Sequence, residues 1–174
     1  KEVPENDKAI FSASGGASMY KKSLFDQLGY FDESFFAYFE DVDLSMRAHL
    51  QRKKIYLSSN ALVHHKMNYT AKKLPGFSRE MAIKNSFYLY WKNVPFPLNI
   101  KILPKFIYCN LRMTGAALTK GQPMAAVKAH FAAALHFPLM MVRRHRIQKN
   151  RKLTSSQFEE LLSTENPFDA VRKV

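Results

Sequence analysis

The spacing of apolar and polar residues divides the chain into two parts with different expected structure. In the first part the apolar runs are short and separated by turn residues, which predicts brief strands and helices. We expect strands at 9–13, 17–20, 55–57 and 61–65, and helices at 22–28 and 41–51. In the second part, longer periodic stretches predict helices at 77–93, 98–118 and 123–142.

Turn and capping residues mark where these elements begin and end. Gly29 follows the first helix at the position where a left-handed glycine commonly ends one. Pro75 and Gly76 mark the boundary between the two parts. Ser156 and Glu159 have the spacing of a capping box, so we expect them to start a last helix.

Charge separates the same two parts. The 174 residues include 27 Lys or Arg and 14 Asp or Glu, a net charge of +13. Residues 1–70 hold nine basic and nine acidic residues, and residues 81–158 hold thirteen basic residues and no acidic one. Such an excess of positive charge indicates an anionic partner, either a membrane surface or a nucleic acid. The single cysteine, Cys109, excludes a disulfide framework and a cysteine-based zinc site.

The basic second part has three possible interpretations. Aromatic and basic residues together suit nucleic acids, a membrane interface, or ordinary helices that face a core. In 98–118 three basic residues lie within about 40° of one another, with an apolar stripe on the opposite face, which favours the membrane. The basic residues are Lys101, Lys105 and Arg112, and the stripe is Leu103, Ile107, Leu111 and Leu118. We do not expect a membrane-spanning helix, because charged residues and prolines interrupt the apolar windows.

The densest acidic cluster is Glu40, Asp41 and Asp43. Three close carboxylates repel one another, which raises at least one pKa and allows one to accept a proton or help hold a divalent ion. The same pattern is typical of a helix start that Asp41 simply caps. His64 and His65 end an expected strand, where only one of two neighbours can face a given side. That one is either a ligand for a metal or phosphate, or a surface histidine.

Two runs of residues form a long and specific pattern. The first run, from Ser14 to Lys22, contains GG-x-x-x-x-K. The second, from Gly29 to Arg47, reads G-x-FDE-x-FF-x-Y-x-ED-x-DL-x-x-R. The pattern resembles family 2 glycosyltransferases, in particular bacterial rhamnosyltransferase-like enzymes of polysaccharide assembly. The likeness covers about residues 10–70. The basic tail is also similar to the tails of these enzymes, but in composition alone.

The resemblance implies an α/β fold, the C-terminal part of a GT-A (Rossmann-like) glycosyltransferase domain followed by an amphipathic helical region. Residues 1–74 then correspond to the acceptor and catalytic-base half, and residues 75–174 to a basic, membrane-associating helical tail. The family's nucleotide-binding half carries a D-x-D metal motif, and no D-x-D precedes Glu40. We therefore expect the visible chain to be an incomplete part of the enzyme and inactive alone.

The resemblance also implies roles on the acidic helix. Asp41 matches the general base, with Glu40 beside it, and Asp43 and Arg47 match supporting positions. In this chemistry the base deprotonates the acceptor hydroxyl, which attacks the anomeric carbon from the face opposite the nucleotide. A single displacement inverts the configuration of the sugar.

Four further residues receive roles by resemblance. Gly15 and Gly16 match the loop below the acceptor and donor sugar. His65 matches the histidine that helps hold the metal or pyrophosphate, with His64 as the fallback. The cofactor is a divalent metal, Mg²⁺ or Mn²⁺, bound mainly by the upstream half.

The expected partners are a nucleotide-sugar donor, with rhamnose as one possible sugar, and a saccharide or lipid-linked acceptor. We expect the protein in the cytoplasm, peripheral on the inner face of a bacterial membrane with an anionic surface, and we expect no nucleic acid. Two alternatives stay open: a non-catalytic module that tethers a partner to the membrane, and a basic nucleic-acid-binding domain.

Overall fold

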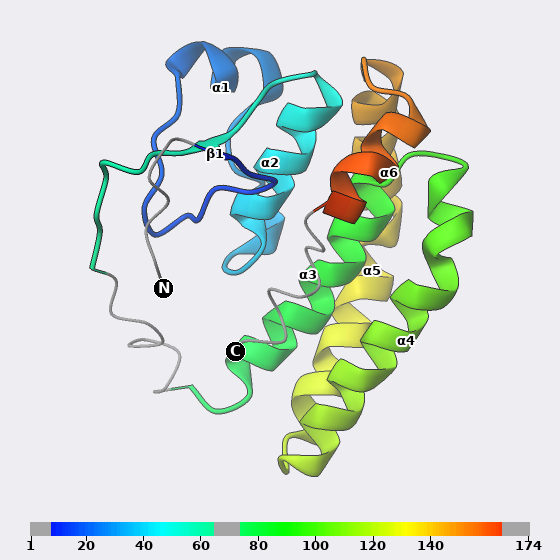
Figure 1. Cartoon of the computed structure of the whole chain (residues 1–174). Coiled ribbons are helices and arrows are strands. Elements are labelled where there is room, and N and C mark those ends of the chain that lie inside the picture. The colour runs from blue at the N-terminus through cyan, green and yellow to red at the C-terminus, as the bar shows by residue number, and fades with distance from the viewer. Residues whose placement is uncertain (1–7, 65–73, 165–174) are drawn as a thin grey trace.

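The computed structural model describes residues 8–64 and 74–164, which are mostly helical (Figure 1). Within these residues two short strands and one 3-10 helix accompany six α-helices. The elements in chain order are β1 Lys8–Ala9, α1 Lys22–Leu28, η1 Glu33–Phe35, α2 Glu40–Leu50, β2 Tyr56–Leu57, α3 Phe77–Asn93, α4 Leu98–Thr119, α5 Pro123–Lys149 and α6 Ser155–Thr164.

The strands are fewer and shorter than the sequence predicts. β1 and β2 pair antiparallel, with Lys8 opposite Leu57. The strand predicted at 17–20 is wrong, because the Ala17 N–H donates to the Ser14 carbonyl and closes a turn there. The strand predicted at 61–65 is absent from its described part, 61–64, where the side chain of Leu62 is 71% exposed. Neither stretch pairs with another described segment. A strand without a partner leaves its backbone N–H and C=O groups unsatisfied, so neither stretch forms a strand.

The helices follow the prediction more closely. α1 ends at Gly29, which adopts φ 78° and whose N–H donates to the Phe25 carbonyl. α2 begins one residue before the predicted start, so that three acids lie in its first turn, where they interact favourably with the helix dipole. α3 has the predicted bounds.

Helices α3, α4 and α5 lie side by side, and α4 and α5 form an antiparallel hairpin (Figure 1). α5 packs most extensively against α3. Ala126, Ala129 and Ala133 are buried on α5. Their small side chains allow the two helix backbones to approach closely, which accounts for the alanine-rich sequence.

α5 continues to Lys149, past the predicted end at 142. The first two residues of the basic run that follows Val142, Arg143 and Arg144, bond to residues of other parts of the chain. The Arg144 guanidinium donates to the carbonyls of Trp91 and Val94 at 2.7 Å each, and so satisfies carbonyls at the end of α3. Basic side chains also interact favourably with the C-terminal end of a helix.

The capping box of α6 lies two residues before the predicted one. The Gln157 N–H donates to Thr154 Oγ1 at 3.2 Å, and Gln157 Oε1 accepts from the Thr154 N–H at 3.1 Å. Ser156 and Glu159 are therefore not the box. Glu159 instead forms an exposed ion pair with Lys101 at 2.6 Å.

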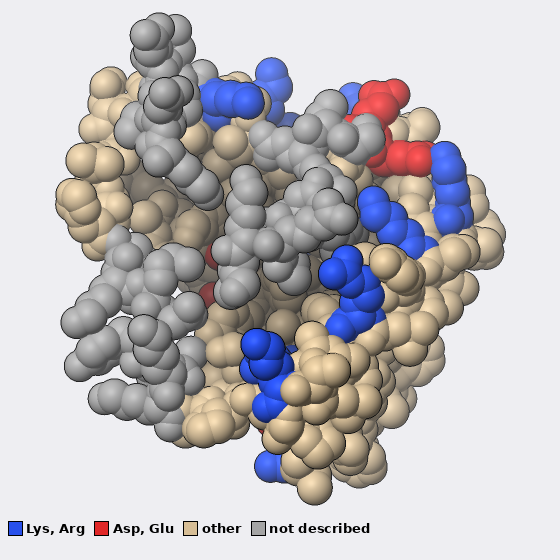
Figure 2. All heavy atoms as spheres, turned by 60° about the horizontal axis from the view of Figure 1, so that its bottom comes forward, with Lys and Arg blue, Asp and Glu red and all other residues tan. Residues whose placement is uncertain are grey.

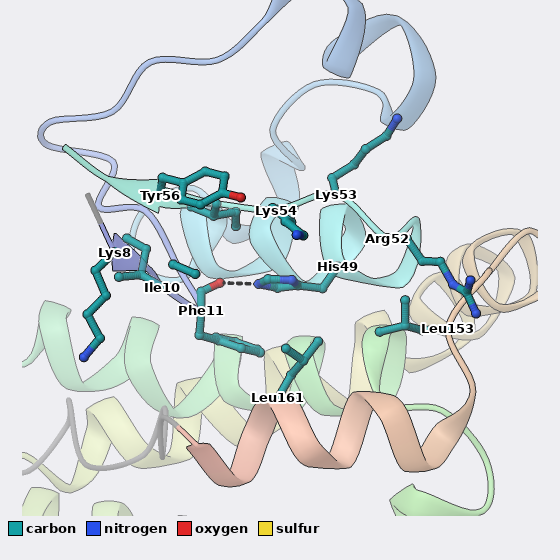
Figure 3. A pocket seen from close by; sticks show the side chains of 12 residues that line it. Lys8, Ile10, Phe11, His49, Arg52, Lys53, Lys54, Tyr56, Leu153 and Leu161 are labelled. Atoms are coloured by element: carbon teal, nitrogen blue, oxygen red, sulfur yellow. Dashed lines mark hydrogen bonds between the residues drawn. The ribbon is translucent and has the colours of Figure 1, made fainter. Parts of the chain in front are cut away.

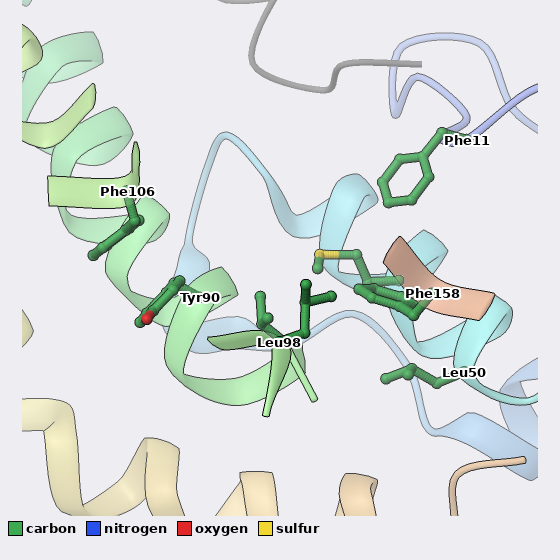
Figure 4. Close-up of a cluster of buried hydrophobic side chains, with 8 residues drawn as sticks. Phe11, Leu50, Tyr90, Leu98, Phe106 and Phe158 are labelled. Carbon is green, nitrogen blue, oxygen red and sulfur yellow. The ribbon is translucent and has the colours of Figure 1, made fainter. Parts of the chain in front are cut away.

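A cluster of buried apolar side chains joins the two parts of the chain (Figure 4). Phe11 and Leu50 come from the first part and lie against Phe158, which is fully buried. Tyr90 stacks on Phe106, with ring centroids 4.0 Å apart. The predicted units 1–74 and 75–174 therefore share a core, so the helices fix the first part in place.

One described helix, α5, is long and apolar enough to cross a membrane by length and composition. Its most apolar window is 28% buried. The same length and composition occur in core helices of soluble proteins, so this property alone decides nothing about a membrane.

Candidate functional site

Two carboxylates at the start of α2 meet the loop at Gly15. The Gly15 N–H donates to Asp41 Oδ2 at 2.7 Å, and the Val42 N–H donates to Asp41 Oδ1 at 2.7 Å. A methyl group on Gly15 would lie 3.5 Å from both Asp41 Oδ2 and Glu40 Oε1. The glycine loop therefore lies directly against both acids, and each Asp41 oxygen has a backbone donor.

Of the two acids, Glu40 and Asp41, Glu40 has fewer groups nearby that stabilise its negative charge. Its Oε2 is buried without a hydrogen-bond partner among the described residues. Burial raises the pKa of the Glu40 carboxyl and the charge of Asp41 adds to the rise, against a hydrogen bond from its own backbone N–H. A carboxyl pair in which one member resists ionisation can accept or return a proton during a reaction.

Asp43 and Arg47 belong to a buried network behind these acids. Asp43 is fully buried and accepts from Arg47 Nε at 2.9 Å. The Arg47 guanidinium also donates to the carbonyls of Leu28, the last residue of α1, and of Tyr30, just after it, at 2.7 and 2.9 Å. Both residues thus hold α2 against its neighbours, and Asp43 has no surface to offer a substrate.

Sequence reasoning missed Lys92, which joins two buried acids. Its ammonium lies 2.5 Å from Asp32 Oδ2 and 2.7 Å from Asp43 Oδ1. Arg143 on α5 forms a further ion pair with Asp32. Burial alone would raise the pKa of Asp32, but the charges of Lys92 and Arg143 outweigh it and lower that pKa. No local signal distinguishes Lys92, because α3 also contains other charged residues, namely Arg79, Glu80 and Lys84.

Three predicted site residues remain: Gly16, His64 and His65. The Gly16 N–H donates to Ser14 Oγ at 3.4 Å within the glycine turn. His64 is exposed after β2. His65 lies outside the described residues. Among the described residues, no three His, Cys, Asp or Glu side chains gather in a way that could hold a metal ion.

A pocket of about 630 Å³ lies away from the two acids, between the strands, the end of α2 and α6 (Figure 3). Lys8, Arg52 and Lys54 are among its lining residues. His49 also lines it, and its Nε2 lies 2.8 Å from the Phe11 carbonyl oxygen. None of the described residues that line the pocket is an acid, so the candidate site for acid–base chemistry is the start of α2.

Comparison with known proteins indicates a relationship to glycosyltransferases. Two curated proteins of Mycobacterium tuberculosis, from strains CDC 1551 / Oshkosh and ATCC 25618 / H37Rv, are similar to part of this chain. Both are named N-acetylglucosaminyl-diphospho-decaprenol L-rhamnosyltransferase. Each is 38% identical over 73 residues, which is 41% of this chain and 24% of the relative.

The chain therefore spans about a quarter of the length of the curated relatives that it matches. No family model matches the chain. No solved structure matches it either. The similarity supports a glycosyltransferase-like protein, and its substrates and mechanism are inferred below.

Proposed function

We propose that this chain is the acceptor and catalytic-base part of an inverting glycosyltransferase of family 2 with a GT-A fold. The observation that carries the proposal is the contact between the glycine loop and the acidic pair, with the Gly15 N–H 2.7 Å from Asp41 Oδ2. The two runs that carry the resemblance meet at this contact, which joins residues 26 positions apart in the sequence. The partial similarity to rhamnosyltransferases supports the same class.

In the proposed reaction the Asp41 carboxylate accepts the proton of an acceptor hydroxyl. The hydroxyl oxygen then bonds to the anomeric carbon as the bond from that carbon to the nucleoside diphosphate breaks, and the configuration inverts. The N–H groups of Gly15 and Val42 fix the orientation of the Asp41 carboxylate. The buried ion pair between Asp43 and Arg47 supports the helix beneath it.

The donor in this proposal is a nucleotide-linked sugar, and rhamnose is the first to test because the relatives are named for it. Their name also contains a saccharide linked through diphosphate to decaprenol, so we propose a lipid-linked saccharide as the acceptor class. A divalent ion bound mainly outside this chain is part of the same proposal. The described residues do not form a metal centre, and no step above depends on one.

The test is sugar transfer by the protein with its whole natural sequence, compared with Asp41→Asn. The variant should bind the sugar nucleotide with unchanged affinity but transfer about 10²–10⁴-fold more slowly, because a general base acts in the transition state. Asp26→Asn is the matched control, since Asp26 is an exposed aspartate on α1. Normal transfer by Asp41→Asn would contradict the assignment and make Glu40 the next candidate.

We also propose that the α4–α5 hairpin docks on an anionic membrane surface from the cytoplasmic side. Five apolar side chains on α4 are between 39% and 66% exposed, and five on α5 are between 60% and 70% exposed. They are Ile100, Leu103, Ile107, Leu111 and Leu118 on α4, and Met124, Val127, Phe131, Leu135 and Val142 on α5. Successive members are separated by the same numbers of residues in both sets, at helical spacing, so each set forms one stripe along its helix.

The charges around the hairpin support the same proposal. Figure 2 shows Lys and Arg side chains in a row beside a broad area without charged side chains. Residues 81–158 contain no acid that would repel anionic lipid. Each Lys or Arg near such a surface contributes about 1 kcal/mol, and apolar side chains that enter the interface add to the binding. An acceptor carried on a lipid would then be presented at the membrane that holds the enzyme.

Flotation with liposomes tests the docking. Binding should require anionic lipid, weaken in high salt, and fall about tenfold or more in Leu111→Asp, because one buried leucine contributes about 1.5–3 kcal/mol. Leu62→Asp is the matched control, since both leucines are similarly exposed, at 71% and 66%. Equal binding to neutral liposomes would contradict the electrostatic part. Resistance to carbonate extraction from native membranes would instead indicate that α5 spans the membrane.

A further inference from the structure

The turn that leads into α2 has an unusual backbone. Phe36 adopts φ 60° and ψ −57°, and the Ala37 N–H donates to the Phe35 carbonyl at 2.7 Å. This is the γ-turn with positive φ, which is the rarer and more strained of the two γ-turn forms. Tyr38 and Phe39 also have positive φ, at 67° and 69°. Bulky residues seldom adopt such angles unless the surrounding structure imposes them.

The side chain of Phe36 does not explain its backbone conformation. That side chain is 79% exposed, so the packing of its own ring fixes little of the γ-turn. The turn nevertheless decides where α2 begins, because Phe39 is the residue before Glu40 and its carbonyl accepts the Asp43 N–H at 2.8 Å. A constraint from another element must therefore hold this backbone.

Asn85, on α3, provides that constraint. The residue is fully buried, and its amide nitrogen lies 3.0 Å from the Phe35 carbonyl oxygen. The same nitrogen lies 2.7 Å from the carbonyl oxygens of Ala37 and Tyr38. The two N–H groups of one side-chain amide are thus shared among three carbonyls of one turn, including the acceptor of the γ-turn itself. Lys84, the preceding residue, adds a bond from its ammonium to the Ser34 carbonyl at 3.1 Å.

We propose that Asn85 is a positioning residue, which holds the strained turn and so sets the place of Glu40 and Asp41 against the glycine loop. This role rests on the function proposed above. α3 then belongs to the catalytic machinery as its scaffold, although the sequence assigns that helix to the tail. Because Asn85 acts through the turn, its loss should lower the rate of transfer and leave the affinity for the donor unchanged.

The test compares two buried asparagines of the helical bundle. Asn85→Leu removes the amide that bonds to the turn. Asn110→Leu is the matched control, because Asn110 is also buried but bonds to Ser86 Oγ and to the Phe106 carbonyl, away from the turn. Hydrogen exchange of the amides at 35–39 should be at least about tenfold faster in Asn85→Leu than in Asn110→Leu, since several hydrogen bonds are lost.

A second pair of variants separates backbone strain from general stability. Phe36→Gly removes the steric cost of positive φ, whereas Phe36→Ala removes the same exposed ring and keeps that cost. In the Asn85→Leu background, Phe36→Gly should restore slow exchange and part of kcat, and Phe36→Ala should not.

Equal exchange in Asn85→Leu and Asn110→Leu would overturn the proposal, as would equal restoration by Phe36→Ala and Phe36→Gly. If exchange behaves as expected while the wild-type protein transfers no sugar, the holding of the turn is supported and the proposed function is refuted.

Discussion

Replacing Lys92 by methionine tests how the helices support the site. Methionine keeps the length of the side chain and removes the ammonium that lies between Asp32 and Asp43. The three side chains are 2%, 8% and 0% exposed, so both carboxylates would lose a buried partner. Removing one member of a buried ion pair typically costs about 3–5 kcal/mol when the remaining charge has no other partner. Arg143 and Arg47 still pair with Asp32 and Asp43, so we expect a loss near the lower end of that range.

The measurement is urea unfolding, with the free energy of unfolding extrapolated to water. Lys101→Met is the matched control, because Lys101 forms an equally short ion pair with Glu159, but these side chains are 67% and 38% exposed. An exposed pair contributes below about 1 kcal/mol. Adding Asp32→Asn to Lys92→Met should recover part of the loss, because it removes the charge of a carboxylate that has lost its lysine and keeps only Arg143 as a charged partner.

The loss in free energy of unfolding that Lys92→Met causes should also depend on pH. In the wild-type protein the pKa of Asp32 is lowered, so its ionised form stabilises the fold above about pH 4 and this contribution fades below that. Without Lys92, Arg143 is the charged partner that still opposes the effect of burial, so the pKa of Asp32 should rise, and protonation relieves the cost of the buried charge. The difference between wild type and variant should therefore shrink as the pH falls from about 7 to 4. A loss as small as that of Lys101→Met, or one that does not change with pH, would refute this account.

Three further predictions concern single residues. Thr154→Ala should cost about 1 kcal/mol of stability in urea unfolding, and Ser156→Ala clearly less, because Thr154 caps α6. Glu40→Gln should raise Tm more at about pH 7 than at about pH 4, since burial raises the pKa of Glu40 and its ionised form destabilises the fold. His65→Ala should weaken metal-dependent donor binding more than His64→Ala, as measured by titration of the donor with Mg²⁺ or Mn²⁺; a larger loss at His64 would reverse the assignment.

The sequence predicted the long helices well because their signals are local. The bounds of α3 follow from its periodicity and from Gly76 before it and the prolines after it. Strands were predicted less well, because a short apolar run such as 17–20 becomes a strand only where a partner lies beside it. The start of α6 was missed by two residues, since Thr154, Ser155 and Ser156 are all possible caps and only the geometry selects one.

Part of the candidate site could be predicted as well. The resemblance indicated both the Gly15 loop and Asp41, and the structure brings them into contact across 26 residues of sequence. The contacts of Lys92 and Asn85 could not be predicted, because they join residues about 50 positions apart and depend on how α3 packs. Nothing in the local pattern distinguishes these polar residues from others on the same helix.

The anomeric configuration of the transferred sugar tests the central claim most directly. The protein with its whole natural sequence would be given nucleotide-linked rhamnose and a lipid-linked diphosphate saccharide, and the new linkage examined by NMR, with Asp41→Asn as the blank. We predict a product whose anomeric configuration is inverted relative to the donor and which does not form in the blank. A product with retained configuration, or equal product from Asp41→Asn, would contradict a single displacement with Asp41 as the base.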